Sequence, residues 1–398
     1  MEENVQLILK LVKKEERNIV KFLRDLIKIP SPSCQEKKVA IRIKYEMEKV
    51  GFDKVWIDEM GNVIGRVGKD EPGILYDGHI DTVGVKDKSE WQFDPFIGKE
   101  KGGYIFGRGA SDNKSATAVQ VYACKILKKI SQANLPKTVY VVGTVQEEDC
   151  DGLALKYVLT NSLKDKVEGV VLGECTNGRI CRGHRGRMEV IIKTKGKSCH
   201  ASDPTRGENA IYKMSGIIKE IESLNDNLKD DKFLRKGTIA VTSIDCNADS
   251  LNCVPCGCRI FIDRRLTAGE TKKIAISELR KLSSVKKFGT VETLKYDSSS
   301  YTGMKIEVEK YYPTWVLKEN HSLVQAGKKT FKKLFGKEAV VDKWTFSTNG
   351  VASMGELGIP TIGFGPSEER FAHSSEDKVS IKHLLQSTAF YSMLPFVL

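Results

Sequence analysis

The sequence predicts an α/β protein in which a larger domain with a largely parallel central sheet is interrupted by a smaller α+β domain. Three observations support this. The 398 residues exceed what a single hydrophobic core usually holds. Short apolar runs alternate with helical stretches toward both ends of the chain. Between them the pattern changes to longer strands and separate helices. We therefore expect the larger domain at 1–182 and 313–398, and the inserted domain at 183–312.

Two helices open the larger domain. Apolar residues recur at helical spacing before Pro30, which ends the first helix: Ile19, Phe22, Leu23, Leu26 and Ile27. Ser33 and Glu36 have the spacing of a capping box for the second helix, and Gly51 suits its C-terminus. Strands are then predicted around 74–76, 139–145, 167–172 and in IPTIGFG (359–365), with a helix at 116–130.

The inserted domain combines strands with two helices, one of them at about 209–224. Its predicted strands are MEVIIKTKG, GTIAVTSI, CRIFIDRRL and KIEVEKYY. No internal repeat or low-complexity linker interrupts the chain. This pattern of strands and helices is typical of a compact α+β unit.

Composition argues against several classes of partner. The net charge is +12, but the lysines are spread over helix faces, and no basic stripe interleaved with aromatic residues favours nucleic-acid binding. No run of 18 apolar residues predicts a membrane span, and the N-terminus has no basic-then-apolar export signal. The ten cysteines lack the spacing of a secreted disulfide framework. Cys253, Cys256 and Cys258 complete no four-ligand zinc set, so we expect reduced thiols and a cytoplasmic protein.

Acidic and histidine residues follow several predicted strands, where open α/β sheets place their ligands. They are His79 in ILYDGHIDTVG, Asp112 in GRGASDNKS, Glu147 and Glu148 in TVQEEDCDG, Glu174 in VVLGECTNG, and His373 in FAHSSEDKVS. Each alone has an ordinary explanation, such as a helix N-cap or an exposed turn. As a set they predict two zinc-like ions, each with one histidine and one carboxylate, plus a shared carboxylate and a water.

Neighbouring residues extend this site. Asp81 lies two residues from His79 on an extended segment, so its carboxylate is placed to orient the imidazole. Of the adjacent glutamates, Glu148 is expected to bind metal and Glu147 to handle a proton. GRGASDNKS also has a slight likeness to a phosphate-binding loop, but the glycine before Lys114 and the full spacing are missing, so nucleotide binding is not favoured.

Over nearly the whole chain, these motifs resemble the co-catalytic zinc family of acetylornithine deacetylase, succinyl-diaminopimelate desuccinylase, aminoacylase and the glutamate-releasing carboxypeptidases (carboxypeptidase G type). TVQEEDCDG, RGRMEV, DKWTFSTNG and IGFGP are similar to its selenium metabolism-linked (YgeY-type) hydrolases. The resemblance implies that His79 and Glu174 hold one ion, that Glu148 and His373 hold the other, and that Asp112 bridges them. It also implies that Glu147 is the general base and that the Asp112–Asn113 peptide is cis.

The resemblance further implies that the inserted domain is a lid that forms a homodimer. His200, in GKSCHAS, would reach the partner's metal centre and stabilise an oxyanion. Asn252 and Arg265 match positions that grip a substrate carboxylate, although the adjacent Arg264 could exchange roles with Arg265. The loop Ser347, Thr348, Asn349 and Gly350 is expected to face the substrate, with a plain turn as the alternative.

The resulting hypothesis is a metal-dependent hydrolase that cleaves an amide bond of an N-acyl amino acid or small peptide. A hydroxide bridging two Zn²⁺ ions, or Co²⁺ or Mn²⁺, would attack the carbonyl, with Asp81, Glu147 and His200 as catalytic residues. A dipeptidase or aminopeptidase of the same family competes with an N-deacylase. A non-catalytic metal-bound binding protein is a further alternative, which the presence of both Glu147 and a complete ligand set disfavours.

Overall fold

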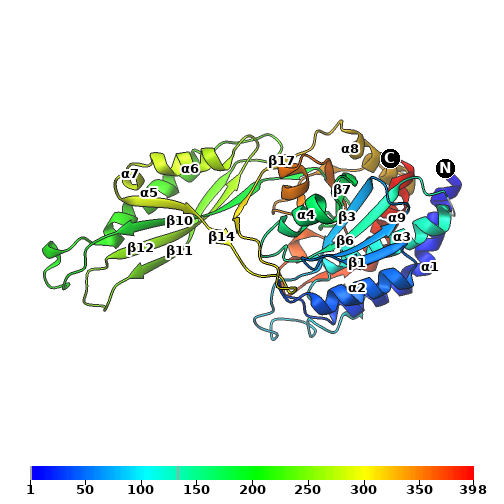
Figure 1. Cartoon of the computed structure of the whole chain (residues 1–398), viewed down its shortest axis with the longest axis horizontal. Helices are drawn as coiled ribbons and strands as arrows, with labels where there is room; N and C mark the ends of the chain where they lie inside the picture. Colours follow the sequence, from blue (N-terminus) through cyan, green and yellow to red (C-terminus); the bar gives the residue numbers. More distant parts are fainter. Residues whose placement is uncertain (1, 132–133) are drawn as a thin grey trace.

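The computed structural model describes residues 2–131 and 134–398 and shows two lobes joined at one end (Figure 1). The lobe that carries both termini is called the first unit here. The elongated lobe, formed by a five-stranded sheet with α5, α6 and α7, is called the second unit. Each has its own hydrophobic core, and the core of the second unit draws on residues between 188 and 291. The boundaries of the expected insertion at 183 and 312 stay a prediction.

The first unit is built on an eight-stranded sheet of order β1-β2-β6-β3-β7-β19-β8-β18. Strand β3 is parallel to β6 and β7, β19 is parallel to β7, and β18 is parallel to β8. The strands are β1 Lys54–Ile57, β2 Val63–Val67, β3 Gly73–His79, β6 Thr138–Thr144, β7 Val167–Leu172, β8 Ile180–Cys181, β18 Val341–Asp342 and β19 Thr361–Gly363. Every residue of β3 and β6 is buried, as in a sheet covered on both faces. The predicted α/β class with a largely parallel central sheet is confirmed.

Helices surround this sheet; α3 packs against β3 and β6 and contacts α1 and α9, and α9 also packs on the sheet, where the rings of Tyr391 and Tyr76 lie 4.6 Å apart. Their bounds are α1 Glu2–Ile27, α2 Lys37–Lys49, α3 Lys114–Ser131, α4 Leu153–Tyr157, α8 Ser322–Phe335 and α9 Ile381–Met393, with short helical turns η1 Val158–Ser162, η3 Val351–Glu356, η4 Glu369–Phe371 and η5 Leu394–Phe396. A small sheet adds β4 Lys99–Lys101, β5 Tyr104–Phe106 and β20 Lys378–Ser380. Among the described helices none has the length and apolar character needed to cross a membrane.

The second unit has an antiparallel sheet of order β11-β12-β10-β13, and β16 also pairs with β10. Its elements are β10 Gly186–Lys195, η2 Pro204–Arg206, α5 Ala210–Asp226, β11 Thr238–Asn247, β12 Gly257–Leu266, α6 Lys272–Lys281, α7 Ser283–Phe288, β13 Gly289–Thr293 and β16 Tyr311–Tyr312. Burial alternates along β10, and its inward residues share a core with α5. The sheet therefore packs one face against the helices.

The chain passes between the units at paired strands. Strand β9, Gly183–His184, leads into the second unit and pairs with β17, Trp315–Val316, which leads out of it. His184 is buried there, and its Nε2 accepts hydrogen bonds from Trp315 Nε1 at 2.8 Å and Thr348 N at 3.0 Å. Its Nδ1 donates to the Arg185 carbonyl at 2.8 Å. Burial lowers the pKa of His184 to about 4, so this imidazole is neutral.

Two local predictions are wrong. Glu36 occupies the cap position of α2 but makes no capping-box bond; its carboxylate instead accepts from Cys34 N and Gln146 N, both at 3.0 Å. Ser33 Oγ donates to Asp81 at 2.7 Å.

The predicted strand KIEVEKYY is divided in the structure. One part is β15, Val308–Glu309, which pairs with β14, Lys295–Tyr296; the other is β16, which pairs with β10. In both cases a long-range partner replaces the local pattern.

Candidate metal centre and active site

The five predicted ligand segments converge at the carboxyl edge of the central sheet. His79 is the last residue of β3, the glutamate pair follows β6, Glu174 follows β7, His373 follows β19, and Asp112 precedes α3. These strands are neighbours in the order β6-β3-β7-β19. Parallel neighbours end at the same edge, which explains why side chains nearly 300 residues apart meet.

The first ligand group is His79, Asp112 and Glu174, and all three side chains are buried. Nε2 of His79 lies 2.8 Å from Oδ1 of Asp112 and 3.7 Å from Oε1 of Glu174. Oε2 of Glu174 is buried without a hydrogen-bond partner among the described residues. A buried carboxylate oxygen of this kind is satisfied when a cation binds beside it.

The second ligand group is Asp112, Glu148 and His373. Nε2 of His373 lies 2.8 Å from Oε2 of Glu148 and 3.3 Å from Oδ2 of Asp112. Asp112 thus turns one oxygen toward each histidine and is shared by both groups. The second group is the more open one, since 55% of the His373 side chain is exposed.

The electrostatics of this cluster require positive charge. Burial raises the pKa of Glu147 and of Glu174 well above the usual range, and neighbouring carboxylates add to the effect. Burial would lower the pKa of His79, but Glu174 and Glu147 outweigh it and raise that pKa well above its ordinary value. Mixed nitrogen and carboxylate donors around a shared aspartate fit a pair of divalent cations.

Asp81 organises the centre through both its backbone and its side chain. Nδ1 of the His79 ring lies 3.0 Å from the Asp81 carbonyl oxygen. The other ring nitrogen, Nε2, therefore points toward the first ligand group. The Asp81 carboxylate is slightly farther from Nδ1, at 3.4 Å. That carboxylate accepts from Glu147 N at 3.2 Å and Glu148 N at 3.1 Å. Asp81 therefore fixes the backbone of the glutamate pair as well as the imidazole.

The loop before Asp112 is held by Asp377, a residue that the sequence analysis did not single out. The Asp377 carboxylate accepts from Gly109 N at 2.8 Å, Ser111 N at 2.7 Å and Arg108 Nη1 at 3.2 Å. The Asp112–Asn113 peptide is cis, as the resemblance implied.

The likeness of this loop to a phosphate-binding loop has no counterpart in the structure. Lys114 is buried, and its Nζ donates to the carbonyls of Leu26 at 3.0 Å and Ile29 at 2.7 Å. A lysine held in this way is directed away from any phosphate.

A cavity of about 400 Å³ opens beside the ligand groups. Besides Glu147 and the ligands Asp112, Glu148, Glu174 and His373, its lining includes Ser347 from the predicted substrate loop and Arg265 from β12. Arg265 brings the second unit to the cavity wall. Its neighbour Arg264 instead is buried and pairs with Glu270 at 2.6 Å and Glu278 at 3.2 Å. Of the two arginines, Arg265 lines the cavity and Arg264 does not.

Two further lining residues were not singled out from the sequence. Arg187 on β10 and Asp151 after β6 form an ion pair with an Nη2–Oδ1 distance of 3.0 Å across the two units. They lie in the motifs RGRMEV and TVQEEDCDG, but neither motif alone indicates that the two side chains pair. Only the approach of the two units makes them neighbours.

The structure does not bring every predicted residue to this cavity. His200 is exposed on the second unit and forms an isolated β-bridge with Cys253, and Asn252 lies in the same region. Neither lines the cavity. Asn349 is buried, with Nδ2 donating to Asp77 and Thr144 and Oδ1 accepting from Gly152 N. Gly350 packs against Trp315 so closely that a Cβ would lie 2.4 Å from the indole.

Comparison with known proteins decides the family. Residues 75–395 match the description of peptidase family M20/M25/M40. The chain belongs to this family. It is thus an M20 hydrolase whose fold gathers two groups of residues that could hold a metal ion.

The M20 assignment agrees with similarity over the full length. The chain is 47% identical over 391 residues to the uncharacterized protein YgeY of Escherichia coli (strain K12), covering 98% of this chain and 96% of that protein. This supports the predicted branch. The fold is similar to that of the M20 family metallo-carboxypeptidase Sso-CP2 from Sulfolobus solfataricus, with TM-score 0.73, 20% identity and coverage of 96% and 98%. It is also similar to YXEP of Bacillus subtilis, a dinuclear metal binding M20 peptidase, with TM-score 0.69, 15% identity and coverage of 97% and 99%.

Proposed function

We propose that this M20 hydrolase cleaves an amide bond of an N-acyl amino acid or small peptide that carries a free carboxylate. One observation carries the proposal. Two ligand groups share Asp112, and four of their five residues line the same cavity as Glu147 and Arg265. This arrangement combines a dinuclear metal site, a proton carrier and a carboxylate-binding group.

The ligand groups define how two cations would be held. His79 and Glu174 would hold one, Glu148 and His373 the other, and Asp112 would bind both. When bound, divalent cations such as Zn²⁺, Co²⁺ or Mn²⁺ supply Lewis acidity, which lowers the pKa of a coordinated water toward about 7 and polarises a carbonyl. Histidine and carboxylate ligands suit zinc, and the unpartnered Glu174 oxygen supports occupancy.

Glu147 is the residue placed to move the proton. It lines the cavity, yet belongs to neither ligand group, and its Oε2 lies 4.0 Å from Nε2 of His79. Burial raises the pKa of its carboxyl, which favours proton uptake. Glu147 would accept the proton of the attacking water and deliver it to the leaving amine nitrogen.

Arg265 would bind the substrate carboxylate. Its guanidinium lines the cavity from the second unit while Asp263 holds its Nε at 2.7 Å, which leaves other donors of the planar fork for a ligand. His200 and Asn252 do not line the cavity of their own chain. Their predicted roles therefore require a homodimer, in which the partner's copies complete the site and His200 stabilises the oxyanion.

The test is metal analysis combined with a substrate screen on the purified protein. N-acyl amino acids, dipeptides and longer peptides would be incubated with zinc, cobalt or manganese and followed by mass spectrometry. We expect about two divalent ions per chain and cleavage that is lost on chelation. Cleavage of acyl amino acids alone would indicate a deacylase, and cleavage of dipeptides a dipeptidase. Two bound ions without turnover of any substrate would favour a metal-bound binding protein.

A further inference from the structure

Two cysteines face each other across the hairpin at the end of the second unit. Cys246 on β11 and Cys258 on β12 are direct partners in the antiparallel register. Their Sγ atoms lie 3.2 Å apart, and both are free thiols. We propose that Cys246 and Cys258 form a reversible disulfide that closes the base of the loop 247–257.

The backbone geometry suits such a bond. Directly opposite residues on antiparallel strands have Cα atoms about 4.5–5.5 Å apart, which lies within the range that disulfides span. The sulfurs need to approach by only about 1 Å to reach bonding distance, which small side-chain rotations supply. No shift of the strand register is needed.

The two thiols differ in a way that assigns them separate steps. Cys246 is exposed, whereas 4% of Cys258 is exposed and it belongs to the core of the second unit. Burial raises the pKa of Cys258 to about 12, and the neighbouring Cys246 adds to this. The Cys246 thiolate is therefore the group that meets an oxidant first.

A small-molecule disulfide such as glutathione disulfide balances the reaction. The Cys246 thiolate attacks one sulfur and releases one glutathione thiolate, giving a mixed disulfide. Cys258 then loses its proton and attacks the sulfur of Cys246, and the second glutathione leaves as a thiolate that takes up a proton. Two thiols of the protein are oxidised while one glutathione disulfide is reduced to two thiols.

Three other cysteines in the same region of the second unit have oxygen atoms as their contacts. Cys199 Sγ donates to the Asp203 carbonyl at 3.4 Å, Cys253 Sγ lies 3.2 Å from Ser250 Oγ, and Cys256 Sγ is 3.9 Å from the Asn247 carbonyl. These three thiols are thus matched controls, because they share the region but not the opposed register. Cys246 and Cys258 are distinguished by geometry and not by local sequence.

Closing this loop would affect the region that carries Asn252 and His200. Ala201 N donates to the Asn252 carbonyl and Val254 N to the Cys199 carbonyl, both at 2.8 Å. The loop is therefore bonded to the segment that holds His200. That a disulfide would also influence substrate binding rests on the proposed function; formation of the bond does not.

The experiment titrates the native full-length protein, loaded with metal, with glutathione disulfide over a series of thiol–disulfide ratios. Samples are alkylated and mapped by peptide mass spectrometry. We expect a loss of two reactive thiols per chain, a mass lower by about 2 Da, and a cross-linked peptide pair containing Cys246 and Cys258, all reversed by dithiothreitol. Formation of the disulfide should also slow hydrogen exchange of the loop 247–257.

Variants separate this proposal from nonspecific oxidation. Cys246→Ser, at an exposed position, should abolish the cross-link, and Cys258→Ser should trap a stable glutathione adduct on Cys246. Cys253→Ser and Cys256→Ser should retain the cross-link unchanged. The proposal is overturned if native protein forms no Cys246–Cys258 bond at ratios that add glutathione to Cys246, or if Cys246 pairs equally with Cys253 or Cys256. These readouts do not depend on turnover, so failure of the proposed hydrolase would leave them interpretable.

Discussion

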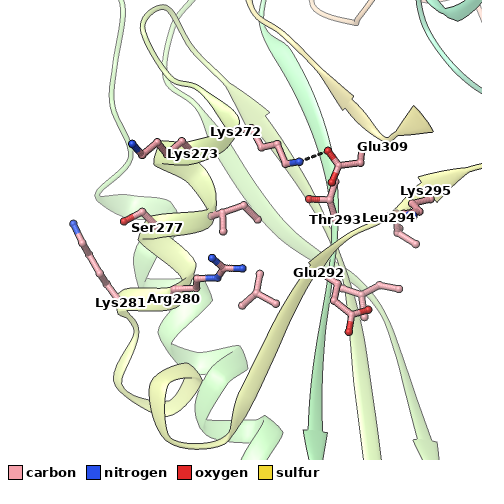
Figure 2. A pocket seen from close by; sticks show the side chains of 13 residues that line it. Lys272, Lys273, Ser277, Arg280, Lys281, Glu292, Thr293, Leu294, Lys295 and Glu309 are labelled. Carbon is pink, nitrogen blue, oxygen red and sulfur yellow. Dashed lines mark hydrogen bonds and ion pairs between the residues drawn. The ribbon is translucent and has the colours of Figure 1, made fainter. Parts of the chain in front are cut away.

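The cavity beside the ligand groups and a cavity of the second unit differ in size and in chemistry. The cavity beside the ligand groups measures about 400 Å³, is lined by residues of both units and gathers carboxylates with His373. The cavity of the second unit measures about 1100 Å³ and is bordered by basic side chains of α6, among them Lys272 and Arg280 (Figure 2). Figure 2 also shows Lys272 paired with Glu309, so part of this charge is neutralised locally. Burial and convergence of ionisable side chains, rather than volume, single out the smaller cavity as the candidate active site.

The largest expected effect tests the proton carrier of the smaller cavity. Glu147→Gln should lower kcat roughly 10²- to 10⁴-fold while metal content is retained, because general acid–base catalysis is lost but neither ligand group is changed. Steady-state kinetics and metal analysis measure both. Asp149→Asn, at an exposed position in the same loop, is the matched control and should keep activity. Undiminished turnover in Glu147→Gln would remove Glu147 from the mechanism.

The second-largest effect is the pH dependence of stability caused by His184, at the junction between the two units. His184 has a folded pKa of about 4 against an ordinary value of 6.5, because burial, with a smaller contribution from Arg265, outweighs the opposing effects of Asp151 and the Arg185 and Thr348 hydrogen bonds. The unfolded chain therefore binds more protons between these values, and stability is lost as pH falls from about 6.5 toward 4. The loss from this group is on the order of 3 kcal/mol.

Urea unfolding of the native protein and of the His184→Gln variant at several pH values isolates the contribution of His184, because the two proteins share all other titrating groups. The free energy of unfolding of the variant should be lower near pH 7 and should fall less steeply below pH 6.5. Parallel pH dependences of the two proteins would contradict a neutral buried His184.

A third prediction compares one arginine from each cavity. Arg265→Met should lower kcat/KM roughly 10- to 150-fold for carboxylate substrates, since a charge-assisted hydrogen bond contributes about 1.5–3 kcal/mol. Arg280→Met, in the cavity of the second unit, is the control and should leave kinetics unchanged. An equal change in kcat/KM for the two variants would contradict a role of Arg265 in binding the substrate carboxylate.

The smallest effect is expected at the surface pair of the larger cavity. Lys272 and Glu309 are both partly exposed, at 34% and 47% of their side chains. Lys272→Ala should therefore change the free energy of unfolding by less than about 1 kcal/mol and leave metal content as it was. Chemical denaturation and metal analysis check this. A loss of bound metal would show that the two cavities are coupled.

The sequence predicted the fold class well because apolar runs and helical periodicity are local properties. Local patterns also predicted that His79, Glu148 and Glu174 lie at or just after strand ends. In the structure these strands are parallel neighbours, which brings the three residues together. Their roles as ligands stay predictions. The capping box at Ser33 and Glu36 was wrong because both side chains bond to segments distant in the chain.

Other features depended on tertiary contacts that no local pattern encodes. Asp377 holds the loop before Asp112 from more than 260 residues away, and Arg187 meets Asp151 across two units. Of the predicted loop 347–350, Ser347 lines the cavity, and the role of the loop in substrate binding stays a prediction. The direction of each side chain in that turn depended on its packing against Trp315 and Asp77, which periodicity does not reveal.

The pairing of β9 with β17 is one of several contacts that fix the two units relative to each other. Tyr301 donates to the Gly61 carbonyl at 2.9 Å, and Arg187 pairs with Asp151 at 3.0 Å. Arg265 belongs to the second unit, whereas the cation ligands lie at the sheet edge. The relative placement of the two units therefore sets the distance between Arg265 and the ligand groups, and this distance would limit the length of a molecule that contacts both.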